Sequence, residues 1–274
     1  MTPMWFRRSP RAEKIAGGFQ FLEGPVWRSQ TGDLLFSDIP ASKIHRLHQD
    51  AIEVFRSPTG KANGNTLDRE GRLVTCEHEN RRVSRTEADG SVTPLATHFR
   101  GKRLNSPNDV VVRKRDGSVY FTDPPYGVPP EARELDFQGI YRVDGANEPQ
   151  LLLEDFDKPN GLAFSPEGTT LYCADTERGH VRAFDVHEDG SLRGGRLFCR
   201  VERPDGMRVD AEGKLWIAAR DGVRAFASTG QAAGKIQVAE QPANLSFGDA
   251  DRQTLYITAR TSLYRIRLEV PGAA

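Results

Sequence analysis

A pattern of two short strands recurs six times along this 274-residue chain. Each unit opens with a polar residue and a short apolar stretch, and a second stretch of the type GxLxxxD follows after a turn. The second stretches occupy residues 32–38, 71–77, 117–123, 169–175, 213–219 and 253–259. Equivalent apolar residues in successive units lie 39 to 52 residues apart, which is the length of one β-propeller blade. The repeat therefore predicts an all-β fold, a six-bladed β-propeller.

The ends of the chain bear on how the ring closes. A third strand is predicted in every unit and a fourth in five units, at residues 51–55, 93–99, 149–156, 195–200 and 235–240. The sixth unit ends without a fourth strand, whereas residues 12–19 form a strand pattern without neighbours. We expect this N-terminal strand to complete the last blade beside residues 263–268, because closure of the ring leaves no exposed seam. Residues 1–274 would form one domain of four-stranded antiparallel blades, with residues 1–11 as a short arm.

The composition excludes several classes of partner. With 38 basic and 38 acidic residues, the chain has no electrostatic reason to bind nucleic acid or an anionic membrane. No apolar run approaches the ~18 residues of a membrane span, and the N-terminus lacks the apolar core of a signal peptide. The three cysteines form neither a zinc motif nor an evident disulfide framework. A reducing cytoplasm is therefore the default compartment that we expect, and the sequence leaves open whether the protein is a monomer or a homodimer.

The polar residue that opens each unit should face the axis of the ring. The first strand of a blade lies nearest the axis and the second runs back, so the start of one and the end of the other share a face. The six opening residues are Glu23, Asn63, Asn108, Asn160, Asp205 and Asn244. At the ends of the second strands stand Asp38, Glu77 with His78, Asp123, Asp175, Arg220 and Arg260. The repeat predicts a polar site at one mouth of the central channel.

The opening residues carry oxygen atoms that suit a hard cation. Ca²⁺ takes roughly six to eight oxygen ligands, and Glu23 and Asp205 supply two negative charges to neutralise it. Without a cation, two carboxylates so close would repel each other and one would bind a proton. An ion with open coordination positions polarises a substrate carbonyl. A purely turn-forming role for each Asn-Gly or Asp-Gly stays an alternative.

Five sequence blocks resemble the SMP-30/gluconolactonase family, over about residues 20–265. The blocks are EGPVW at 23–27, NSPNDVVV at 105–112, YFTDPPYG at 120–127, PNGLAFSP at 159–166 and PDGMRVDAEGKLWIA at 204–218. The subgroup with RLNSPNDVVV, TDPPYG and CEHxNRR is most similar to bacterial gluconolactonases. The family fold is a six-bladed β-propeller, as the repeat alone predicts.

This resemblance implies one divalent ion in the channel, Ca²⁺ in most members and Zn²⁺ in some, with Mg²⁺ or Mn²⁺ as further alternatives. By motif, its ligands would be Glu23, Asn160 and Asp205, while Asn108 matches a position that either ligates the ion or binds substrate. Asp205 also matches the acid that acts as base or nucleophile in related enzymes. Animal members carry an Arg two residues before the Asn of their ND motif, and Ser106 stands there in this chain.

The resemblance, together with these residues, implies a metal-dependent lactonase acting on sugar lactones such as glucono-1,5-lactone. The ion would stabilise the oxyanion, and Asp205 would take a proton from the attacking water or, as an alternative, attack directly. Asn108 would orient the substrate. For His78 we weigh proton transfer equally against a structural hydrogen bond.

Further substrate contacts are expected outside the ring. His78, Arg82 and Tyr126 would replace the Arg of the animal members, and Asp123 is a candidate at its strand end. Residues 124–138 form a long insertion, a length typical of functional loops, and should set the width of the site.

Two other functions fit the same pattern. One is hydrolysis of apolar lactones or phosphotriesters, which a mouth lined by Tyr126, Phe137 and Trp27 would favour, whereas a rim of His, Arg and Asp favours sugars. The other is a non-catalytic calcium-binding or protein-binding propeller, which predicts a filled channel or a metal without an open coordination position.

Overall fold

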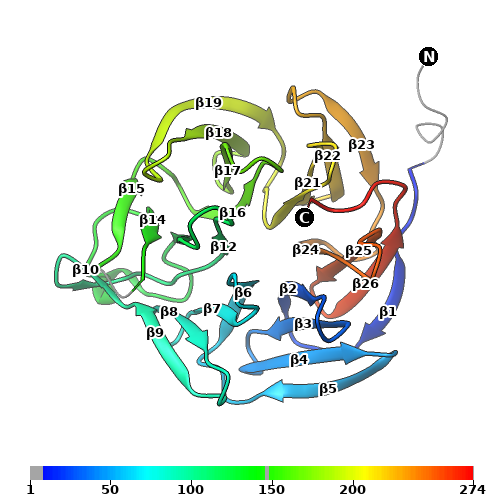
Figure 1. The fold of residues 1–274 in the computed structure, drawn as a ribbon, viewed down its shortest axis with the longest axis horizontal. Coiled ribbons are helices and arrows are strands. Elements are labelled where there is room, and N and C mark those ends of the chain that lie inside the picture. Colours follow the sequence, from blue (N-terminus) through cyan, green and yellow to red (C-terminus); the bar gives the residue numbers. More distant parts are fainter. Residues whose placement is uncertain (1–8, 146–147, 274) are drawn as a thin grey trace.

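A computed structural model describes residues 9–145 and 148–273 of the chain. Six four-stranded antiparallel sheets surround a central axis in chain order (Figure 1). The first three sheets are β2–β5 (Leu22–Arg28, Asp33–Asp38, Lys43–His48, Ala51–Arg56), β6–β9 (Ala62–Leu67, Leu73–Glu77, Arg82–Thr86, Val92–Ala96) and β12–β15 (Val110–Val112, Val119–Asp123, Gly139–Val143, Gln150–Leu153). The next two are β16–β19 (Pro159–Phe164, Thr170–Asp175, His180–Val186, Leu192–Arg200) and β20–β23 (Met207–Val209, Leu215–Ala219, Gly222–Phe226, Ala232–Ile236). The sixth joins β24–β26 (Pro242–Gly248, Thr254–Ala259, Ser262–Arg267) to β1 (Glu13–Gly17).

The ring closes as the sequence predicts. β1 pairs antiparallel with β26 and becomes the outermost strand of the last blade. Each first strand contacts the first strands of both neighbouring blades, and β24 contacts both β20 and β2. Because both ends of the chain contribute to one sheet, the ring has no open seam.

The arm predicted over residues 1–11 is only partly tested, since residues 1–8 lie outside the described residues. Its last part is not free. The Ala12 N–H donates to the Gln237 carbonyl at 2.9 Å, and the Gln237 N–H donates to the Pro10 carbonyl at 2.8 Å. This pairing ties the N-terminal segment to the fifth blade as well as to the sixth.

The second strands explain why the repeat is readable. Every residue of β3, β7, β13, β21 and β25 is buried. Both faces of a blade are covered by neighbouring blades, so these strands need apolar residues along their whole length instead of an alternating pattern. Leu34, Leu35 and Phe36, for example, are consecutive and fully buried.

The outer strands depart from the predicted bounds. The fourth strand of the fifth blade is Ala232–Ile236 and not 235–240, because Gln237 pairs with the N-terminal segment. The strand predicted at 93–99 stops at Ala96, and residues 98–103 form the separate hairpin of β10 (His98–Phe99) and β11 (Lys102–Arg103). No helix among residues 9–145 and 148–273 is both long and apolar enough to cross a membrane.

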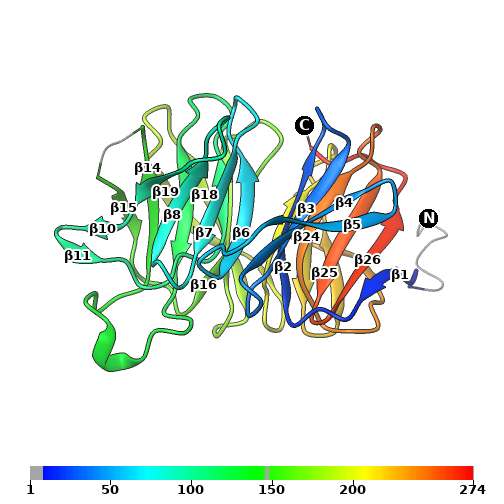
Figure 2. The ribbon, with the colours of Figure 1, turned by 90° about the horizontal axis from the view of Figure 1, so that it is seen from below.

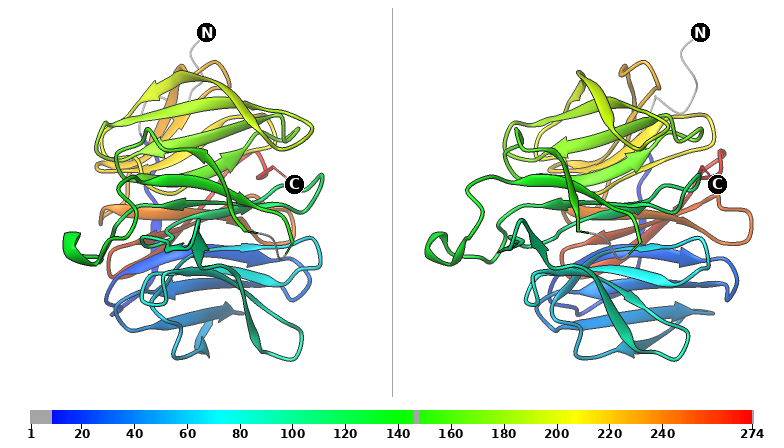
Figure 3. Two further views of the ribbon diagram at one scale, coloured as in Figure 1. Left: turned by 90° about the vertical axis from the view of Figure 1, so that its left-hand side faces the viewer. Right: turned by 60° about the vertical axis from the view of Figure 1, so that its left-hand side comes forward.

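The insertion at residues 124–138 contains one short 3-10 helix, η2 (Pro130–Ala132). It follows β13 and, coloured green, projects from one face of the disc (Figures 2 and 3). That face is the one where the first strands begin.

Candidate functional site

A cavity of about 600 Å³ opens at the face where the first strands begin. Five of the six opening residues line it: Glu23, Asn63, Asn108, Asn160 and Asp205. The sixth, Asn244, is buried and donates its amide to Glu23 Oε2 at 3.0 Å. The repeat therefore brings side chains from all six blades to one mouth of the channel.

Glycines let the opening residues converge. A Cβ atom on Gly24 would lie 2.0 Å from the Asn63 carbonyl oxygen, and the φ of Gly24 is +48°. A Cβ atom on Gly161 would lie 2.3 Å from the Asp205 carbonyl oxygen. Only glycine permits this approach between neighbouring backbones, so the Gly after Glu23 and Asn160 helps set the diameter of the ring.

The two carboxylates that face the cavity hold protons more tightly than free acids. The pKa of Glu23 is raised to about 7 by burial and by the charge of Asp109. Hydrogen bonds from the Gly24 N–H and the Asn244 amide lower it again, but only in part. Burial raises the pKa of Asp205 well above its usual value, and the charges of Glu23 and Asp109 add to the effect. Like charges confined in a low dielectric share a proton unless a cation neutralises them.

The donor set fits a hard divalent cation. Asn63 Oδ1 is buried and accepts no hydrogen bond, and Glu23, Asn108, Asn160 and Asp205, which line the cavity, carry carboxylate or amide oxygens. The amide oxygen of Asn244 instead accepts the Leu245 N–H. Within the described part of the chain, no group of three or more His, Cys, Asp or Glu side chains could hold a metal. The candidate ligand set is therefore two carboxylates together with asparagine oxygens. An all-oxygen set of this kind suits Ca²⁺ better than Zn²⁺.

His78 lines the cavity next to the ring. Its Nε2 lies 3.0 Å from the Asn63 amide nitrogen. Burial and the charge of Lys61 lower the pKa of His78 to about 4. The imidazole is therefore neutral at pH 7, and with the Asn63 amide donating to Nε2 its proton sits on Nδ1.

Tyr126 reaches the cavity from the start of the insertion. Burial and the charge of Asp205 raise the pKa of Tyr126 to about 12, against hydrogen bonds with Thr176 and Asn160. The phenol thus stays protonated and can donate a hydrogen bond beside Asp205.

Three charged residues at or beside the site were not predicted from the sequence: Arg203, which lines the cavity, and Asp109 and Arg208, which lie next to the ring. Asp109 is 1% exposed, and its Oδ1 accepts the Val110 N–H at 2.9 Å. Arg208, on β20, lies close enough for its charge to lower the pKa of both Glu23 and Asp109. A signal existed for Asp109, because it occupies the place where four other units have the glycine that follows the opening residue.

Two predicted substrate contacts do not line this cavity. Arg82 Nε pairs with Glu77 Oε2 at 2.8 Å on the neighbouring strand. Asp123 is fully buried, and its Oδ2 accepts the Asn105 N–H at 2.7 Å. Three of the four acids that end second strands, Asp38, Asp123 and Asp175, accept backbone N–H groups, whereas Glu77 accepts side-chain donors.

The residue one position further along faces the cavity instead. These residues are Ile39, His78, Thr176, Arg220 and Arg260. Successive side chains of an extended segment point to opposite sides, so a shift of one residue separates an acid that accepts backbone N–H groups from a side chain that faces the cavity.

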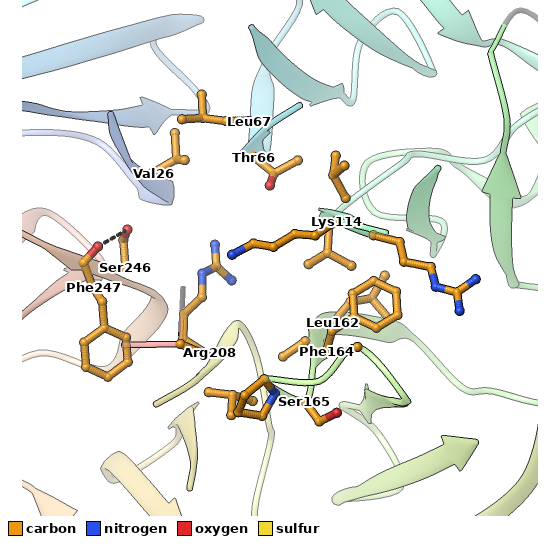
Figure 4. Close-up of a pocket in the computed structure, with 18 of the residues that line it drawn as sticks. Val26, Thr66, Leu67, Lys114, Leu162, Phe164, Ser165, Arg208, Ser246 and Phe247 are labelled. Atoms are coloured by element: carbon orange, nitrogen blue, oxygen red, sulfur yellow. Dashed lines mark hydrogen bonds between the residues drawn. The ribbon is translucent and has the colours of Figure 1, made fainter. Parts of the chain in front are cut away.

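A second cavity of about 400 Å³ lies at the opposite ends of the first strands (Figure 4). Apolar side chains, including Val26, Leu67, Leu162 and Phe247, form much of its wall. Lys114 and Arg208 extend into it (Figure 4). Trp27 belongs to this second cavity, and Phe137 packs edge-on against Phe99, so neither aromatic residue narrows the first mouth.

The model of a protein family described as SMP-30/Gluconolactonase/LRE-like region matches residues 21–261. This chain belongs to that family. A relative, the gluconolactonase of Zymomonas mobilis subsp. mobilis, is 31% identical over 294 residues, which cover 95% of this chain and 82% of that protein. A regucalcin from Oryctolagus cuniculus is 28% identical over 269 residues, covering 86% and 82% of the two chains.

Solved structures of the family agree with the architecture. A gluconolactonase from Xanthomonas campestris superposes with a TM-score of 0.87 at 34% identity, over 97% of this chain and 95% of that one. A luciferin-regenerating enzyme superposes with a TM-score of 0.79 at 20% identity, over 96% and 98%, and shows the fold alone. The predicted propeller and the family resemblance are both confirmed.

Proposed function

We propose that this protein is a metal-dependent lactonase that hydrolyses sugar lactones such as glucono-1,5-lactone. One observation carries the proposal: carboxylates from the first and fifth blades, Glu23 and Asp205, face one cavity with Asn108 and Asn160, and burial raises the pKa of both acids. The similarity to gluconolactonases from two bacteria supports this choice of reaction.

Glu23, Asn108, Asn160 and Asp205 would hold one divalent cation, Ca²⁺ by preference, which would act as a Lewis acid toward the lactone carbonyl. The raised pKa values support this assignment, because a cation is the simplest counter-charge for two acids that otherwise retain a proton.

Asp205 acts as the general base in this proposal. Its carboxylate takes a proton from water as the water oxygen bonds to the carbonyl carbon. The bond between that carbon and the ring oxygen then breaks, the ring oxygen takes the proton from Asp205, and the open-chain aldonic acid forms, which loses its own proton to the solvent as the aldonate. Asn108 orients the substrate, and the neutral His78 and protonated Tyr126 hold its hydroxyl groups or return the proton.

The lining of the mouth supports a polar substrate. His78 and the arginines Arg203, Arg220 and Arg260 line it, whereas Trp27 and Phe137 do not. We accordingly propose a small sugar lactone as the partner, in preference to an apolar lactone, a phosphotriester, nucleic acid or a membrane.

The test is a pH-stat titration of acid released from glucono-1,5-lactone by protein with added Ca²⁺, after chelation, and with Asp205→Asn. We expect turnover to need the cation and to fall by about a thousandfold in the variant. Asp185→Asn, which changes an exposed acid on β18, is the matched control and should behave as the wild type. Turnover that survives both chelation and Asp205→Asn would refute the proposal.

A further inference from the structure

The basic side chains at the rim of the cavity gather on one side. In the fifth and sixth blades, the residue that follows the second strand is an arginine, Arg220 or Arg260. Arg203, in the connection that leads to β20, is a third arginine in the lining. The corresponding residue of the first blade is Ile39. Three guanidinium groups therefore belong to one sector of the mouth.

Arg220 and Arg260 have no strong charged partner within the part of the chain that the structure describes, whereas the charge of Arg203 already lowers the pKa of Asp205. Arg220 Nη1 pairs with Glu202 Oε1 at 2.7 Å, but both side chains are more than half exposed, and such pairs are weak and easily exchanged. Arg260 Nη2 donates to the neutral amide oxygen of Gln241 at 3.1 Å. Among the described residues that line the cavity, the only acids are Glu23 and Asp205, which belong to the ring.

The sign of the rim opposes the sign of the ring. The ring attracts a cation, whereas three arginines at the entrance attract an anion and bind carboxylate or phosphate oxygens in pairs. A cavity of about 600 Å³ is large enough for a six-carbon sugar lactone lying between the two. A neutral lactone would offer these guanidinium groups no negative charge to bind.

We propose that the preferred substrate carries a second, anionic group, a carboxylate or a phosphate, at the end of the sugar away from the lactone carbonyl, and that Arg203, Arg220 and Arg260 bind it. This inference rests on the proposed lactonase function and names its substrate class.

Three matched lactones test the inference: glucono-1,5-lactone, the same lactone with a carboxylate in place of its terminal hydroxymethyl group, and its 6-phosphate. We expect kcat/KM to be about tenfold higher for at least one charged lactone, and the larger ratio identifies the anionic group. The ratio should fall to about one in the double variant Arg220→Met/Arg260→Met. Arg196→Met, an exposed arginine on β19, is the control and should leave the ratio unchanged.

Glu202→Gln gives a test in the opposite direction. It releases Arg220 from its carboxylate partner Glu202, so the preference for the charged lactone should increase. Equal kcat/KM values for all three lactones, or a ratio that the double variant leaves intact, would overturn the inference while lactonase activity stands.

Binding of the open-chain products gives a readout that needs no turnover. Calorimetry should show the dicarboxylate or phosphorylated product binding about tenfold more tightly than gluconate to the wild type, and equally to the double variant. Equal binding to the wild type contradicts the inference. If no lactone is hydrolysed but the charged product still binds through the arginines, the lactonase proposal alone fails.

Discussion

The two mouths of the channel are built by the same six strands and differ in almost every chemical respect. The starts of the strands supply two acids and several amides to a cavity of about 600 Å³. Their far ends supply Val26, Leu67, Leu162 and Phe247 to a cavity of about 400 Å³, and these four residues also pack in or against the hydrophobic clusters of the protein. The polar side chains of the site therefore lie at the strand starts, away from the far ends where apolar side chains pack between blades.

The two mouths are nevertheless linked by charge. Arg208 lines the second cavity, and its charge lowers the pKa of Glu23 and Asp109 at the first. Lys114, also at the second mouth, has its pKa lowered by burial and by the charge of Arg252. The second mouth is thus basic, and Arg208 limits the negative charge that accumulates at the first.

The largest expected effect is on lactone turnover, which should depend on a charged residue at the first mouth but not on one at the second. Glu23→Gln removes one of the two charges that would hold the cation, so we expect lactone turnover to fall by about a thousandfold. Lys114→Met removes a charge at the second mouth and should leave turnover within about twofold. Measured side by side in the pH-stat assay, equal losses in the two variants would show that the comparison is wrong.

The second effect concerns pH. Below about pH 7 the metal-free protein retains a proton on Glu23, and burial raises the pKa of Asp205 well above its usual value, so this acid also favours its protonated form. A cation must displace these protons, so its affinity should fall as the solution is acidified, by up to tenfold per pH unit for each proton released. Calorimetric titration with Ca²⁺ between pH 5.5 and 8.5 measures this slope. An affinity that does not change with pH contradicts the proposed ligands.

The smallest effect concerns the insertion, which projects only at the first mouth. Arg81 is buried, and its guanidinium donates to the carbonyls of Leu104, Asn105 and Ala132. Arg81→Met leaves these acceptors without a donor, and we expect the free energy of unfolding to fall by about 2 kcal/mol.

Urea denaturation measures the loss, and hydrogen exchange of residues 124–138 shows whether the insertion loosens first. Arg85→Met is the control, because Arg85 forms a partly exposed pair with Glu87 and should cost at most about 1 kcal/mol. Unchanged exchange in Arg81→Met would mean that other contacts hold the insertion.

Much of this molecule could be predicted from sequence because its information is repeated. The buried second strands mark each blade, and the Gly after Glu23 and Asn160 marks where the ring converges. What could not be predicted depends on single departures from the repeat. Arg208 lies between the buried residues Met207 and Val209 of β20, and only the structure shows that its side chain reaches the channel.

The errors have equally local causes. Asp123 ends a second strand and is therefore predicted in the site, but a difference of one residue decides whether a side chain binds the backbone or faces the cavity. The fourth strand of the fifth blade was displaced by a partner more than 200 residues away in the chain, the N-terminal segment that pairs with Gln237.

Anomalous diffraction from crystals grown with Mn²⁺ tests the central claim most directly. The account predicts one strong peak at the first mouth, within about 2.5 Å of carboxylate oxygens of both Glu23 and Asp205. A peak that contacts neither acid, or that lies only among the basic side chains of the second mouth, would contradict it.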